Sequence, residues 1–215
     1  MVAIVRYQLA TLLHSQRYLP PVLIYVALVA VLYSEPTAPL SPEYAVSAGA
    51  MAAVACWLTI VTVSAEAPAQ RLITVSHARR PGRLVIGVAL VVLVCCLALT
   101  AATLGWSLVV HRGGRVAEVI IGGLVHIAGA LAGIAVGLPC SRLLVDSIGR
   151  TLILSTAGLS VLVLSPWVPV LHPALRALSG IPAPGPRPAV LSLVAAAALL
   201  TISCAAVNVA ERRRR

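Results

Sequence analysis

The chain has 215 residues, of which 60% are hydrophobic and only 10% are charged, and its mean hydropathy is +1.01. Soluble globular proteins carry about 25% charged residues, so this composition excludes an ordinary soluble enzyme. The net charge of +10 does not indicate a nucleic-acid-binding module, because the basic residues form short clusters between apolar segments. Apolar runs near or above about 18 residues recur, and they indicate helices that cross a bilayer.

All 16 basic residues are Arg, and the chain contains no Lys. A P-loop needs a Lys to reach the nucleotide phosphates, and Schiff-base catalysis needs a Lys amine, so this chain can carry neither chemistry alone. Phe is absent as well. We interpret this bias as the mark of a GC-rich bacterial genome.

The first 17 residues form the first expected element. Residues 1–17 place apolar side chains on one side and Arg, Gln and His on another, which predicts an amphipathic elbow helix lying in the membrane interface. Pro20 and Pro21 follow, where the chain would turn into the bilayer. A secretory signal also places an apolar run after basic residues. The junction of Ala38 with Pro39 disfavours cleavage, so we expect the segment to be retained.

The remaining residues, 18–215, predict an all-α transmembrane domain with six spans. The expected spans are 18–33, 44–64, 84–110, 119–139, 151–171 and 189–209. Residues 65–83 form a polar, Arg-containing segment between the second and third spans, and residues 166–188 form a Pro/Gly-rich hairpin before the last span.

The distribution of Arg predicts the orientation. Six spans place both termini on one side, which would hold twelve of the arginines, while the other side would hold four. Positive charge accumulates on the cytoplasmic side of a membrane protein. We therefore expect both termini in the cytoplasm and the chain in the inner (plasma) membrane of a bacterium.

The segment between the second and third spans is the candidate for binding a partner. Pro68 suits a first helical turn and Pro81 would end the segment, which predicts a short helix with a small apolar face and a ring of Arg, suited to docking a cytoplasmic protein. The residues expected to make this contact are Gln70, Arg71, Leu72, Ile73, His77, Arg79 and Arg80. The alternative is that this cluster only sets the topology and touches lipid head groups.

This layout resembles the membrane subunit of an ABC-2 type exporter. The shared features are the basic elbow, the proline-marked first span, six spans with cytoplasmic ends, the basic segment before the third span, and the proline-rich outer hairpin. The resemblance implies that residues 67–80 form a coupling helix for an ATP-binding cassette subunit. It also implies a second, smaller contact around Arg142 and Asp146, and a dimer with a second copy or a related permease.

No GxxxxGK[ST] motif is present, so ATP and Mg²⁺ would be bound by the partner subunit, and we expect no cofactor in this chain. The expected function is therefore that of a transport subunit moving an amphipathic or lipid-like substrate by alternating access. The alternative is a membrane scaffold or assembly factor that docks a cytoplasmic protein. No catalytic constellation or metal-binding spacing is found, so an enzyme is the weakest reading.

Small residues recur at four-residue spacing in two spans, which predicts close helix packing within the chain or a seam between two copies. These packing candidates are Gly49, Gly129, Gly133 and Gly137. Few polar groups lie inside the spans, and Trp57, His126 and Asn208 are the candidates for a substrate path, although each could equally serve packing alone. The five Cys lie in or beside spans, where they act as small core side chains.

Overall fold

The computed structural model describes residues 1–66, 82–111, 115–145, 147–180 and 186–213, and these residues form helices without any strand. The helices are α1 (Val2–Ser15), α2 (Leu19–Leu32), α3 (Leu40–Ala65), α5 (Gly82–Val110), α6 (Val116–Cys140), α7 (Ile148–Leu164), α8 (His172–Ser179) and α9 (Arg187–Arg213). The expected all-α fold is confirmed.

Among the described residues, four helices are long and apolar enough to cross a membrane: α3, α5, α6 and α9. The α1–α2 pair meets the same test if it is taken together, although its two halves are bent by 80°. The chain is therefore a helical multi-pass membrane protein with four or five helices fit to span the bilayer. The sixth span predicted from the sequence is not confirmed.

The difference lies in the predicted fifth span, 151–171. Helix α7 ends at Leu164, and Ser165 already has an extended backbone, with φ −78° and ψ 122°. Pro166 and Pro169 follow; each lacks an N–H group, and each disfavours helical geometry in the residue before it. The 17 residues of α7 extend roughly 26 Å at 1.5 Å per residue, less than a hydrocarbon core of about 30 Å. The chain then turns into the short helix α8, inside the predicted outer hairpin.

The bend between α1 and α2 has a local cause. Gln16, which follows the last residue of α1, adopts a left-handed conformation with φ 56°. Its N–H group donates to the carbonyl oxygen of Leu13, which closes the helix. Proline then occupies the first turn of α2, where a missing N–H group costs no helical hydrogen bond.

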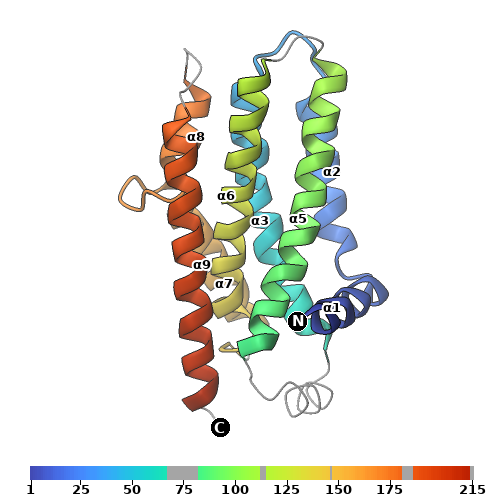
Figure 1. Cartoon of the computed structure of the whole chain (residues 1–215), viewed down its shortest axis with the longest axis vertical. Helices are drawn as coiled ribbons and strands as arrows, with labels where there is room; N and C mark the ends of the chain where they lie inside the picture. The colour runs from blue at the N-terminus through green and yellow to red at the C-terminus, as the bar shows by residue number, and fades with distance from the viewer. Residues whose placement is uncertain (67–81, 112–114, 146, 181–185, 214–215) are drawn as a thin grey trace.

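Figure 1 shows that α1 and the last turn of α9 lie at one end of the bundle, which we call the terminal end. Helix α3 begins and α5 ends at the opposite, distal end. Helix α6 lies between α3 and α9 and packs most extensively against these two helices. The Ser203 hydroxyl donates to the carbonyl oxygen of Ala135 at 2.7 Å, which fixes α9 to α6.

Candidate functional site

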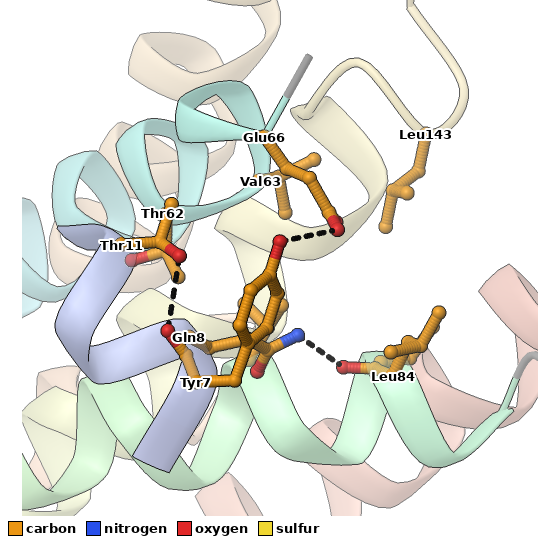
Figure 2. A pocket seen from close by; sticks show the side chains of 10 residues that line it. Tyr7, Gln8, Thr11, Thr62, Val63, Glu66, Leu84 and Leu143 are labelled. Atoms are coloured by element: carbon orange, nitrogen blue, oxygen red, sulfur yellow. Dashed lines mark hydrogen bonds between the residues drawn. The ribbon is translucent and has the colours of Figure 1, made fainter. Parts of the chain in front are cut away.

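Helix α1 is attached to both ends of the segment that the sequence predicts to bind a partner. Figure 2 shows Tyr7 reaching Glu66, on the near side of residues 67–81, and Gln8 reaching the beginning of α5, on the far side. The Tyr7 hydroxyl donates to Glu66 Oε1 at 3.3 Å, and Gln8 Nε2 donates to the carbonyl oxygen of Leu84 at 3.3 Å. We call these two hydrogen bonds the elbow contacts.

The elbow contacts are reinforced by close packing against α5. A Cβ atom placed on Gly87 would lie 2.7 Å from Gln8 Oε1 and 2.8 Å from Ile4 Cγ2, so a larger residue would force these two side chains to move. One turn further along α1, Leu12 is 1% exposed and joins a cluster with Val61 of α3 and Val91 of α5. Helix α1 is therefore seated on α3 and α5 through a buried face.

A second feature of the terminal end is an open groove between α3 and α7, with a volume of about 400 Å³. We call it the α3/α7 groove. Its walls combine apolar side chains with hydroxyl groups and one guanidinium group. They are formed by Ala53, Cys56, Trp57, Ile60, Ser64, Arg142, Val145, Ile148, Thr151, Leu152, Ser155, Thr156 and Leu159. This volume falls within the roughly 300–1,000 Å³ that is usual for small-molecule sites.

The elbow contacts and the groove are supported by neighbouring residues of the same two segments. The cavity beside the elbow contacts holds only about 20 Å³, and Glu66 and Leu143 line it, whereas Ser64 and Arg142 line the groove. The last turn of α3 and the loop after α6 therefore present one side to α1 and another to the groove. Arg17 adds a direct link, because its Nη1 donates to the carbonyl oxygen of Ser64 at 3.4 Å.

The small residues of α6 form a seam with α3. A Cβ atom on Gly129 would lie 2.6 Å from the carbonyl oxygen of Ala48, and one on Gly133 would collide with the carbonyl oxygen of Ala52. Gly137 repeats the arrangement one turn later, where the nearest atom is 2.7 Å away, on Thr59. These three glycines thus bring two backbones of the same chain into direct contact.

Toward the distal end, a chain of buried polar groups joins α2, α3 and α6. The Tyr33 and Ser47 hydroxyls lie 3.0 Å apart, and the Ser47 hydroxyl lies 3.0 Å from His126 Nε2. His126 Nδ1 lies 2.7 Å from the carbonyl oxygen of Gly122, and the His126 side chain has no exposed surface. These polar groups satisfy one another, as buried polar atoms must, and they fix the three helices together.

Beside this chain lies a carboxyl–imidazole pair at the beginning of α3. Glu43 Oε2 and His111 Nε2 are 3.7 Å apart, and the two side chains are only 6–7% exposed. The His111 ring also meets Tyr33 edge-on, with ring centroids 6.2 Å apart. In the described part of the chain, neither Glu43 Oε2 nor the two nitrogens of His111 have a hydrogen-bond partner.

The structure separates the three residues that were predicted to line one substrate path. Trp57 lies in the α3/α7 groove and is 48% exposed, His126 is held inside the polar chain, and Asn208 lies between α5 and α9. Arg142 is exposed and lines the groove with Trp57. Gly49, the packing candidate of the second predicted span, faces Leu175 of α8, with a contact of 3.9 Å from its Cβ position.

Most of the predicted partner-binding set lies outside the described residues. This applies to Gln70, Arg71, Leu72, Ile73, His77, Arg79, Arg80 and Asp146. The residues that flank the segment are described, and they are the ones that make the elbow contacts.

Sequence reasoning missed Glu43, His111 and Gln8 as members of buried polar sites. Glu43 and His111 each lie next to a loop, where a charged side chain is ordinary, and 68 positions separate them, so no spacing pairs them. The spacing of Gln8 was a weak indication that this residue is buried. It lies four residues before the apolar Leu12, which places both on the same face of α1, one helical turn apart.

Comparison with protein-family profiles, curated proteins and solved structures finds no significant match.

Proposed function

We propose that this chain is the permease subunit of an ATP-driven exporter of the ABC-2 type. The observation that carries the proposal is the shared support of the elbow contacts and the α3/α7 groove. A partner that pulls on residues 67–81 acts on the last turn of α3 at one end and on the beginning of α5 at the other. Because Ser64 and Glu66 belong to the same turn, a displacement of this turn reshapes the groove.

Helix α1 would hold the two flanks of residues 67–81 in a fixed position relative to each other. Tyr7 and Gln8 tie the two flanks of the segment to one rigid helix, so a push from outside the membrane is delivered to both flanks together. A conformational change needs an element with two arrangements and a ligand that favours one of them. ATP binding and hydrolysis in the partner subunit would supply that bias, with Mg²⁺ held at the same partner site.

The groove indicates the class of substrate. Its walls are mainly apolar, Trp57 offers a flat aromatic surface, and the Ser64, Thr151 and Thr156 hydroxyls offer hydrogen bonds. Arg142 adds a single positive charge among the lining residues. These groups suit an amphipathic or lipid-like molecule with a polar or anionic end.

The test is copurification and ATPase activity. The chain is coexpressed with a candidate ATP-binding cassette protein from the same organism, and any complex that forms is isolated in detergent. The double charge reversal Arg79→Glu/Arg80→Glu is expected to abolish copurification, or to leave ATPase activity that no substrate stimulates. The matched control is Arg115→Glu/Arg176→Glu, which reverses two charges outside the 67–81 segment and should leave both measurements unchanged.

Full copurification and full transport in the Arg79→Glu/Arg80→Glu protein would overturn the coupling role of the segment. Retention of a cytoplasmic protein without a nucleotide-binding fold would instead favour the scaffold function. Substrate-stimulated ATPase activity of the unaltered complex separates these two outcomes.

A further inference from the structure

A second groove lies at the terminal end, between α5 and α9, with a volume of about 420 Å³. We call it the α5/α9 groove. Seven residues line it: Gly82, Arg83 and Ile86 from α5, and Ala205, Asn208, Val209 and Arg212 from α9. The four α9 residues follow helical spacing along one face, so the groove runs lengthwise along this helix.

The floor of the groove is apolar, and its rim at the terminal end is basic, on the side that the distribution of Arg predicts to face the cytoplasm. Ile86 and Val209 are 43% and 51% exposed, so both offer hydrocarbon to whatever fills the groove. Arg83 and Arg212 stand on the two different helices, both near the ends of those helices at the terminal end. No acidic side chain is among the seven lining residues.

Two of the lining residues, Gly82 and Asn208, contact each other across the groove. A Cβ atom on Gly82 would lie 2.6 Å from Asn208 Oδ1 and 2.7 Å from Asn208 Nδ2, so the Asn208 amide rests directly on the α5 backbone. Asn208 Oδ1 is buried and has no hydrogen-bond partner among the described residues. The amide therefore joins α5 and α9 within the groove and leaves one buried acceptor oxygen unpaired there.

The surroundings of the α5/α9 groove indicate which kind of molecule would bind in it. Only 22% of the most apolar stretch of α9 is buried inside the chain, the lowest value among the four long apolar helices, so α9 is the most open of these four to surrounding lipid. Basic pockets between membrane helices on the cytoplasmic side bind the head groups of anionic lipids. A second copy related by a two-fold axis through this face would set Arg83 and Arg212 against the same two arginines.

We propose that the α5/α9 groove is a binding site for one anionic phospholipid. The phosphate lies between Arg83 and Arg212, where guanidinium groups make charge-assisted hydrogen bonds to its oxygens. One acyl chain lies on Ile86, Ala205 and Val209. The site does not depend on the transport function, since it uses no residue of the elbow contacts or of the α3/α7 groove.

The experiment measures lipid binding to the full chain. Purified protein is titrated with phosphatidylglycerol or with phosphatidylcholine of the same acyl chains, and bound lipid is counted by native mass spectrometry. Phosphatidylglycerol is expected to bind preferentially. Arg83→Gln and Arg212→Gln should each weaken its binding about fivefold, and the double variant about 25-fold, because one arginine near an anionic membrane surface contributes about a fivefold gain.

Two controls keep the site distinguishable from general charge attraction. Arg150→Gln removes an exposed arginine of α7 at the same end of the bundle and should leave binding unchanged. Ala205→Trp keeps both groove arginines but fills the floor, and it should weaken binding as strongly as the double variant. Ala205 is exposed, so this change does not disturb the core.

The proposal is overturned if phosphatidylcholine binds as well as phosphatidylglycerol, or if Arg150→Gln weakens binding as much as Arg83→Gln. It is also overturned if Ala205→Trp leaves binding intact, or if inorganic phosphate displaces the lipid at equal concentration. The last result would reveal a simple anion site without an acyl-chain groove.

Discussion

Glu43 and His111 bring a carboxyl group and an imidazole to within 3.7 Å of each other inside the distal end of the bundle. One residue begins the apolar helix α3, and the other directly follows α5, so the pair ties two membrane helices together. The distance exceeds that of a hydrogen bond, so the contact is an ion pair only while the imidazole is protonated and the carboxyl group is ionised.

The pair predicts a coupled effect on stability. His111→Ala leaves the Glu43 carboxyl group buried without its partner, and leaving a buried polar group unpartnered costs about 1–3 kcal/mol. We expect a loss at the low end of this range because the pair is loose. A double-mutant cycle with Glu43→Gln, followed by thermal unfolding in detergent, measures the coupling. Strictly additive losses would show that the two residues do not interact.

The α3–α6 seam predicts that Gly133→Ala is destabilising. The new methyl group meets the carbonyl oxygen of Ala52, a backbone atom that cannot turn away. Overpacking of this kind costs about 1–3 kcal/mol. Gly149→Ala on α7 is the matched control, because nothing lies within 4 Å of its Cβ position. Equal unfolding midpoints for the two variants would contradict the seam.

The contact between α1 and α5 predicts that Gly87→Ala loosens the elbow. The added methyl group displaces the Gln8 and Ile4 side chains, which weakens the packing of α1 against α5. Trypsin cleavage after Arg17, which is exposed, should then become at least about fivefold faster, which corresponds to a local loss of about 1 kcal/mol. Gly105→Ala on the same helix has open space around its Cβ position, and its cleavage rate should match that of the unaltered protein.

The α3/α7 groove predicts a selective loss of transport. Thr156→Trp places a large ring in the groove, so substrate-stimulated ATPase activity should fall to the basal level while the partner subunit still copurifies. Val161→Trp adds the same ring to α7, at an exposed position that does not line the groove. A loss of stimulation in both variants would indicate a general effect of tryptophan on α7.

The parts of the fold that depend on residues close together in the sequence could be predicted from the sequence. Hydrophobic length predicted the cores of α3, α5, α6 and α9, and Pro20 with Pro21 predicted the bend into α2. The end of α7 was missed because Trp167, Val168 and Val170 keep the stretch apolar after Pro166 has already ended the helix. A hydropathy scale scores side chains only, so it does not detect that proline lacks the backbone N–H group that a helix needs.

The candidate sites were less predictable, because they depend on which helices become neighbours. The spacing of Gly129, Gly133 and Gly137 revealed a face for close packing, but it could not name α3 as the partner. In the same way, Trp57 and Asn208 shared a polar character in apolar spans, yet they face separate grooves. Only the packing of α6 between α3 and α9 assigns them to different sides.

The glycine seam limits how this protein can move. With Ala48 and Ala52 carbonyl oxygens seated against successive glycines, α3 and α6 are locked in register, and a small slide would drive a backbone oxygen into the next turn. The shortest step that restores the match is a full helical turn, about 5.4 Å. We therefore expect α3 and α6 to move as one rigid unit. Any gating motion would then come from movement of other helices, such as α7, relative to this unit.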